Sequence, residues 1–381
     1  MTVALSLDPD LPLAGLVSEV PDAVLMPPMG PERPQSCGVF AKGQPVLQSQ
    51  CFGGSAQNPV TVFPAPLPGP LPAAAHLQGR YFFGGVLPGH FGHMLVEGTS
   101  RLWALKGRDD IDAVLYFARP FDKTKVSGSR FAQMAALLGL PPVIVLTEPT
   151  GVGHLVVAEQ GLGAGELMNG RPEARAYLRE KMALVSAEGQ GRRLYITRSG
   201  QPARRGMILA EASLETLFAA QGYEIILPEA FTLQRQVAMF RGASHVVGTE
   251  GSPFHLLALA GREGCKVAVI QRRRSVTFGQ ICEHLEWFIG GFVTRIDTIT
   301  SIHAPKKTRN SNFIYLEPSR AAMWQALAQA GFVAGAAWGE LTPTERQSAL
   351  NWLETETGHR LLPAAVQDLP EDDGDAEKDA A

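Results

Sequence analysis

The chain has 381 residues, of which 45% are hydrophobic and 19% charged, so it can bury a sizeable core and is not globally disordered. The net charge is −3, but Asp368–Asp379 holds seven acids and one lysine, which leaves the remainder at +3. A body so near neutrality argues against a nucleic-acid-binding protein. Four cysteines without C-x-x-C spacing argue against a disulfide framework or structural zinc.

The first ten residues contain no lysine or arginine, unlike a signal peptide, and no run of about 18 apolar residues predicts a membrane span. We therefore expect a cytoplasmic protein. The basic run Arg272–Arg274 leaves peripheral membrane association open, but we interpret it as a solvated turn, because three charges are few for a lipid surface.

Residues 1–79 are rich in proline and glycine, which predicts short strands and extended loops packed on the first domain. Residues 80–170 alternate between strand and helix patterns and predict an α/β domain. Its expected strands are Tyr81–Val86, Ala113–Ala118 and Pro142–Leu146, and its expected helices are Gly92–Lys106 and Arg130–Leu138.

Residues 171–310 show the alternation most clearly, with about 20–25 residues per strand–helix unit, which predicts a parallel sheet with right-handed crossovers. A helix over Arg171–Val185 leads into this domain. The expected strands are Arg193–Thr197, Tyr223–Leu227, His245–Gly248 and Lys266–Ile270, and the expected helices are Ile208–Gln221, Thr232–Arg241 and Pro253–Ala260. Residues 311–365 hold two closing helices, Arg320–Ala330 and Thr342–Thr357, and residues 366–381 form an acidic tail expected to be disordered.

This pattern predicts the α/β class, with two α/β domains facing each other. Ligands of open parallel sheets bind beyond the carboxyl ends of the strands. Two such sheets would form a cleft suited to an enzyme that brings two substrates together.

The first candidate site lies on the predicted helix after Tyr81–Val86. At 100° per residue, one stripe of this helix carries His93, Glu97, Ser100 and Arg101. A His–Glu pair four residues apart can hold an imidazole as a general base. The alternative is a solvated helix face with an ordinary ion pair.

The second candidate follows the strand Arg193–Thr197, where Arg198 and Arg205 could bind phosphate oxygens. Its alternative is a basic surface loop. The third is the turn from Val247 to His255, in which Gly251 permits close approach and Ser252 could cap a helix whose amino terminus attracts anions. Its alternative is a βα turn without a ligand. The D-x-D sequences Asp8–Asp10 and Asp110–Asp112 are badly placed for a metal site.

Together these blocks, in their order and spacing, resemble glycosyltransferase family 61, which includes bacterial capsular polysaccharide biosynthesis proteins. The resemblance spans roughly residues 80–275. It rests on His90–Glu97, Arg101–Trp103, Ile196–Arg198, Glu211, Gly222–Glu229, Gln236–Val237, Ala243 and the turn ending at His255. Many relatives have His in place of Glu250 and Asn in place of His255.

The resemblance implies a GT-B-like fold of two facing Rossmann-like domains. It implies inverting transfer of a hexosyl or pentosyl group from a nucleotide sugar to a glycan hydroxyl in polysaccharide biosynthesis, without a metal or other cofactor. His93 and Glu97 would be catalytic, and the nucleotide sugar would be bound by Arg198, Arg205, Thr249, Glu250, Gly251, Ser252 and His255. The alternative is a catalytically inactive glycan- or nucleotide-binding module of the same fold.

Overall fold

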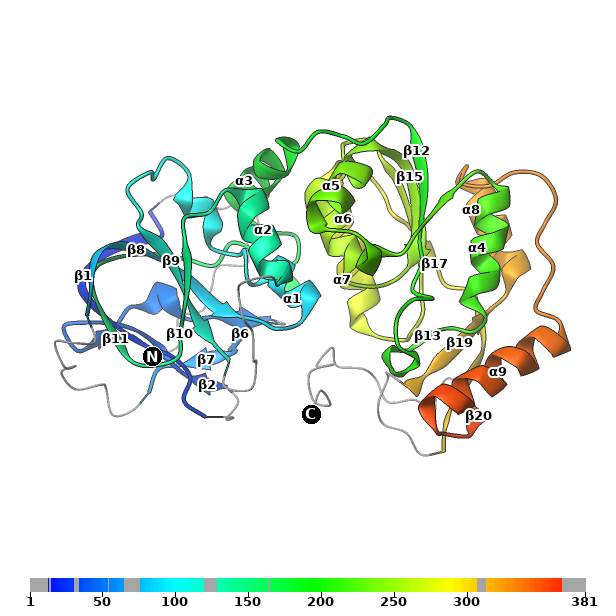
Figure 1. The fold of residues 1–381 in the computed structure, drawn as a ribbon, viewed down its shortest axis with the longest axis horizontal. Coiled ribbons are helices and arrows are strands. Elements are labelled where there is room, and N and C mark those ends of the chain that lie inside the picture. The colour runs from blue at the N-terminus through cyan, green and yellow to red at the C-terminus, as the bar shows by residue number, and fades with distance from the viewer. Residues whose placement is uncertain are drawn as a thin grey trace. The chain divides into compact units, whose positions relative to one another are not determined.

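The computed structural model describes residues 13, 15–30, 34–53, 55–64, 76–119, 129–163, 165–306 and 313–364 (Figure 1). The predicted acidic tail, residues 366–381, lies outside this part of the chain. The chain divides into two compact units, Met1–Val185 (unit 1) and Ser186–Ala381 (unit 2), each with its own sheets and core.

Unit 1 is built on a mixed sheet of seven strands in the order β10-β9-β8-β11-β1-β3-β4. The strands β10, β9, β8 and β11 pair with one another in parallel, whereas β1 pairs antiparallel with both β11 and β3, and β3 pairs antiparallel with β4. Their bounds are β1 Val17–Met26, β3 Gly38–Ala41, β4 Gln44–Pro45, β8 His76–Leu87, β9 Ala113–Ala118, β10 Val143–Leu146 and β11 Thr150–Ala158. The predicted strands of residues 80–170 are confirmed, whereas β11 was not predicted.

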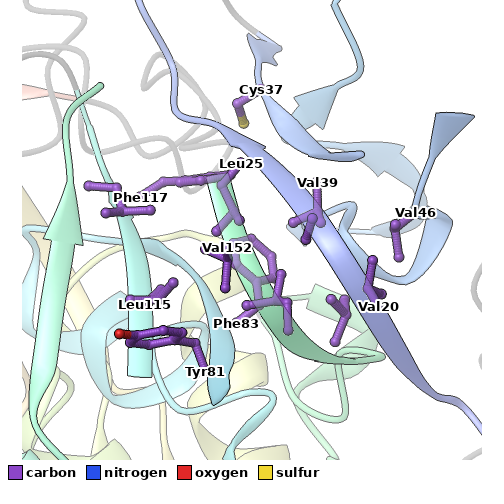
Figure 2. Close-up of a cluster of buried hydrophobic side chains, with 14 of the residues drawn as sticks. Val20, Leu25, Cys37, Val39, Val46, Tyr81, Phe83, Leu115, Phe117 and Val152 are labelled. Carbon is purple, nitrogen blue, oxygen red and sulfur yellow. The ribbon is translucent and has the colours of Figure 1, made fainter. Parts of the chain in front are cut away.

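The proline-rich amino-terminal region contributes strands to this sheet and does not merely pack against it. β1 lies between β11 and β3 over its carboxyl-terminal half. Val20 and Leu25 of β1 and Val39 of β3 join Phe83 and Leu115 in one buried core (Figure 2). Two smaller sheets each have two strands: β2 (Gln35–Ser36) pairs with β7 (Thr61–Val62), and β5 (Phe52–Gly53) pairs with β6 (Ser55–Pro59). The short helix η1 spans Leu47–Ser49.

Helices pack on the other face of the unit 1 sheet, where Tyr116 of β9 contacts the ring of Phe131 on α2, with centroids 5.1 Å apart. They are α1 Phe91–Val96, η3 Leu102–Leu105, α2 Arg130–Leu138 and α3 Pro172–Ala183, whereas η4 Gly165–Leu167 contacts β6. Because α3 packs on η3 and α2, unit 1 extends one helix beyond the predicted boundary at residue 170.

The single helix predicted over Gly92–Lys106 is wrong, because the chain leaves the helical path after Val96. The N–H of Gly98 donates a hydrogen bond to the carbonyl of His93, five residues earlier (3.1 Å), and the hydroxyl of Thr99 donates one to the carbonyl of Leu95 (2.7 Å). Both bonds use acceptors that a continuing helix would need for its own N–H groups.

Unit 2 contains a parallel five-stranded sheet in the order β14-β12-β15-β16-β17. Numbered along the chain this order is 2-1-3-4-5, one of the two common doubly wound topologies. Figure 1 shows helices on both sides of the sheet. The strands are β12 Arg192–Ile196, β14 Glu224–Ile226, β15 Ala243–Thr249, β16 Lys266–Ile270 and β17 Thr294–Ile296, and the helices are α4 Glu211–Ala220, α5 Leu233–Gly242, α6 Pro253–Ala260 and α7 Val276–Leu285.

A second sheet of unit 2 has the order β13-β19-β18-β20 and packs against the last closing helix, whereas the first closing helix packs on the core of the five-stranded sheet. The remaining elements are η5 Ala203–Arg205, β13 Met207–Ile208, η6 Pro228–Ala230, the π-helical turn η7 Glu286–Gly290, β18 Ile299–Pro305, β19 Tyr315–Pro318, α8 Arg320–Gln329, α9 Pro343–Thr357 and β20 Leu361–Ala364. The predicted start of a helix at Ile208 is wrong. Ile208 pairs with Leu316 in this sheet, and α4 begins only after Ala210 turns the chain with a positive φ of 56°.

These elements confirm the predicted α/β class and the alternating strands and helices of unit 2. The GT-B-like arrangement of two Rossmann-like domains stays a prediction. Within the described ranges, none of the helices has the length and apolar character needed to cross a bilayer.

The close approach of β12 and β15 predicts a sensitive glycine at their junction. A Cβ on Gly248 would lie 2.4 Å from the carbonyl oxygen of Ile196, so Gly248→Ala should push the strands apart and lower the free energy of unfolding by about 1–3 kcal/mol. Gly279→Ala, in open space within α7, is the control and should stabilise the chain by about 0.5–1 kcal/mol. Urea denaturation measures both; equal effects would contradict the close packing.

Candidate functional site

The strand order of unit 2 brings two predicted site segments together. β12 and β15 are neighbours at the point where the winding of the sheet reverses, and Ile196 pairs with Gly248. Arg198 follows β12, and Glu250 follows β15. Doubly wound sheets bind ligands at this switch point, beyond the carboxyl ends of the strands.

The carboxylate of Glu211 ties these two strand ends together. Its Oε1 accepts the backbone N–H of Arg198 (2.9 Å) and the hydroxyl of Thr249 (2.8 Å). Glu211 is the first residue of α4, where the helix dipole favours negative charge. Burial raises the pKa of Glu211 despite these hydrogen bonds. Glu211 thus positions both predicted segments, although the sequence indicated it only as an acidic residue that opens a helix.

Three arginines gather around Glu250, and we call Arg198, Arg272 and Arg273 the arginine cluster. Arg273 Nε donates to Glu250 Oε1 (3.1 Å) and Arg272 Nε to the Glu250 carbonyl (3.1 Å). Arg198 and Arg272 both donate to the backbone carbonyl of Arg205, at 3.3 and 3.2 Å. The side chain of Arg205 itself is exposed. Arg205 therefore meets the cluster through its backbone.

The interpretation of Arg272–Arg274 as a solvated turn is wrong for two of its residues. Arg272 is only 6% exposed, and the side chain of Arg273 is 11% exposed, whereas that of Arg274 is 48% exposed. The run leaves β16 at the same sheet edge as Arg198 and Glu250, because β16 is parallel to β15. Arg272 and Arg273 follow the predicted strand Lys266–Ile270 closely, and this position in the sequence could have identified them as residues of the shared edge.

The arginine cluster is a cationic site in a poorly solvated place. Burial lowers the pKa of Arg198 and lowers that of Arg272 well below its ordinary value, and neighbouring arginines add to the effect on both. Burial raises the pKa of Glu250, against the attraction of all three arginines. Desolvation penalises the charged form of each of these groups, and the guanidiniums also repel one another. A bound anion would relieve that repulsion.

The turn after β15 lies against Arg198. A Cβ on Gly251 would be 2.7 Å from Nη1 of Arg198, so only glycine leaves room for the guanidinium in this position. Pro253 occupies the first turn of α6 as predicted, but the predicted cap is wrong, because the Ser252 side chain makes no capping hydrogen bond. Ser252 has helical φ and ψ of −54° and −28° instead of the extended conformation of a capping residue.

His255 lies in the interface between α6 and α7. Its Nδ1 is 2.9 Å from Nδ1 of His284, and both rings are buried. Burial, and then the neighbouring His255, lower the pKa of His284 well below its ordinary value. His284 is therefore held neutral in a buried contact that joins two helices.

In unit 1, the predicted pair of His93 and Glu97 is in contact, with His93 Nδ1 3.0 Å from Glu97 Oε1. The His93 side chain is 33% exposed and that of Glu97 is 17% exposed. Burial alone would raise the pKa of Glu97, but the charge and hydrogen bond of His93, with a contribution from Arg119, hold that pKa below its ordinary value. An ionised Glu97 can accept a hydrogen bond from Nδ1–H, which orients the ring so that Nε2 can act as a base.

Ser100 and Arg101 do not share this face, contrary to the predicted helical stripe. Both are fully buried beyond the end of α1. Arg101 donates to the carbonyls of Ala158 (3.0 Å) and Gln50 (2.7 Å), which makes it a structural residue. Arg119, which was not predicted, instead acts on Glu97, because it follows β9 at the same sheet edge that leads from β8 into α1.

In the part of the chain that the structure describes, no three His, Cys, Asp or Glu side chains come together in a way that could hold a metal ion.

The buried histidine pair predicts a loss of stability in mild acid. The unfolded chain binds a proton at His284 near pH 6.5, whereas the folded chain resists it, so stability is complete above pH 6.5 and falls below it by up to about 1.4 kcal/mol per pH unit. His284→Asn should reduce the difference in unfolding free energy between pH 7.5 and 5.5, measured with urea. The exposed His359→Asn is the control. An unchanged difference in His284→Asn would contradict this origin.

The family comparison covers all three candidate sites that were predicted from the sequence. The model of the Glycosyltransferase 61 family matches residues 91–268, a little under half of the chain. The matched segment runs from α1 to β16, contains the His93–Glu97 pair and Glu250, and ends shortly before Arg272. No curated protein matches the chain. The family match supports glycosyltransferase family 61 for this chain and, with it, a glycosyltransferase that acts on a sugar donor and an acceptor.

Proposed function

We propose that the chain is an inverting, metal-independent glycosyltransferase that moves a sugar from a nucleotide-sugar donor to a glycan hydroxyl. The observation that carries this proposal is the arginine cluster at the switch point of the unit 2 sheet, beside the glycine turn at Gly251. Cations and backbone N–H groups aimed at a diphosphate can take the place of a metal ion as the leaving group develops charge.

On the donor side, Arg198 is the main ligand of the diphosphate. Its Nε is buried without a hydrogen-bond partner among the described residues, and its Nη1 lies against Gly251. The N–H groups of the turn at Gly251 and Ser252 would add donors, and Thr249 and Arg205 hold the surrounding backbone. His255, turned toward α7, would act by fixing α6.

On the acceptor side, His93 is the base. Its Nε2 takes the proton of the acceptor hydroxyl as that oxygen attacks the anomeric carbon. The bond from this carbon to the diphosphate breaks, and the nucleoside diphosphate leaves with the electron pair. A single displacement of this kind inverts the anomeric centre. Glu97 orients the imidazole and stabilises its cation, as its 3.0 Å contact with Nδ1 supports.

One observation favours a second candidate, a glycan- or nucleotide-binding module without catalysis. Glu250 places a carboxylate inside the arginine cluster and already pairs with Arg273, which reduces the charge available to a leaving group. Turnover of any nucleotide sugar would exclude this candidate. The polysaccharide role, the choice between hexosyl and pentosyl transfer, and the cytoplasmic location stay predictions.

Replacing the proposed base should reduce turnover without weakening donor binding. His93→Ala should lower kcat by about 10²–10⁴-fold, because proton transfer loses its acceptor, and should leave nucleotide affinity nearly unchanged. His154→Ala is a matched control, since His154 is also 33% exposed and contacts a carboxylate, that of Glu19 (2.7 Å). Wild-type turnover in His93→Ala would remove His93 from the mechanism.

A thermal-shift panel of nucleoside diphosphates and nucleotide sugars should find a ligand that raises the melting temperature. Arg198→Ala should then weaken that ligand by about 10–100-fold in calorimetry, because one or two charge-assisted hydrogen bonds are lost. Arg274→Ala removes a charge beside the arginine cluster from an exposed side chain and should have little effect. Equal affinities in both variants would place the phosphate site elsewhere.

A further inference from the structure

The arginine cluster contains a carboxylate that the binding of phosphate does not explain. The side chain of Glu250 is 1% exposed, and its Oε1 accepts from Arg273. Its Oε2 is buried and has no hydrogen-bond partner within the described residues. A buried acceptor without a partner is destabilising and is rare in native structures, so an unmet partner is expected.

A second carboxylate near Arg198, that of Glu211, also has one hydrogen-bonded oxygen and one buried oxygen without a partner among the described residues. Glu211 uses Oε1 for two hydrogen bonds, whereas its Oε2 is also buried without a partner in the described part of the chain. Burial raises the pKa of both carboxyl groups and the charge of Arg198 opposes that rise in each, so both acceptors lie near Arg198, the proposed phosphate ligand. An ionised phosphate oxygen cannot satisfy these acceptors in their ionised form, because it too only accepts hydrogen bonds and repels a carboxylate.

We infer that Glu250 binds sugar hydroxyl groups next to the diphosphate, so that the site takes a diphosphate joined to a sugar ring and discriminates against bare diphosphate. The inference rests on the proposed function, which supplies the diphosphate. Hydroxyl groups are donors that a carboxylate accepts readily, and a buried charged acceptor rejects an analogue that lacks them. The ring is either the ribose of the nucleotide or the sugar to be transferred.

The experiment measures affinities of wild type and Glu250→Gln by calorimetry. The ligands are the ribonucleoside diphosphate with the largest thermal shift, its 2′-deoxy counterpart, the corresponding nucleotide sugar and inorganic pyrophosphate. Wild type should prefer the hydroxyl-bearing ligands by about 10–100-fold over those that lack the hydroxyl. Glu250→Gln should lose most of this preference and bind pyrophosphate at least as tightly, because the amide does not repel it.

The pattern of loss identifies the source of the hydroxyl. A preference between the ribose and deoxyribose forms that disappears in Glu250→Gln assigns the contact to ribose. If wild type prefers the nucleotide sugar over the nucleoside diphosphate and Glu250→Gln loses this preference, the contact is with the transferred sugar. Glu224→Gln, which alters an exposed ion pair with Arg192 in the same unit, is the control and should retain every preference.

The failures are distinguishable. If no diphosphate binds, or Arg198→Ala binds as wild type does, the proposed function fails. If the ligands bind and depend on Arg198, but wild type shows no preference or Glu250→Gln retains it, the inference on Glu250 is overturned while the proposed function stands. If Glu250→Gln does not fold, Glu250→Asp is the second variant, which keeps the charge but withdraws the carboxylate by one methylene. Retention of the full preference for hydroxyl-bearing ligands in Glu250→Asp would also overturn the inference.

Discussion

The hydrogen bonds of the buried Glu211 carboxylate are the interaction on which the candidate donor site depends. One oxygen holds the backbone where the chain leaves β12 and the side chain where it leaves β15. Both bonds cross the junction of two parallel strands, so they fix the relative positions of Arg198 and the turn at Gly251 before any ligand arrives. Preorganisation of this kind lets binding groups act without reorganising.

The balance of charge in the arginine cluster follows from that fixed backbone. Three guanidiniums surround Glu250 in a place where desolvation weakens every ionised form. Arg198 and Arg272 share the carbonyl of Arg205 as an acceptor, and Arg273 pairs with the carboxylate of Glu250, but these contacts do not cancel the excess of positive charge. A site with this balance of charge suits an anionic ligand, as the proposed function requires.

The sequence predicted the parts of the fold that depend on local patterns. The βα alternation of unit 2 and the helix predicted over Arg130–Leu138 are confirmed. The errors came from long-range pairing: Ile208 becomes a strand through Leu316, and Arg272 is buried because β16 lies beside β15. The contact of His93 with Glu97 could be predicted because it spans four residues, whereas Arg119 reaches Glu97 only through the sheet.

The pairing of β1 with β11 also constrains how unit 1 is made. Val17 lies opposite Ala158, about 140 residues later in the chain. During synthesis the edge of β1 that faces β11 must therefore stay unpaired until nearly all of unit 1 has left the ribosome, although β3 can pair with its other edge earlier. Such a high contact order slows folding and exposes an apolar strand edge in the meantime. Low temperature or chaperones during expression should therefore favour recovery of intact protein.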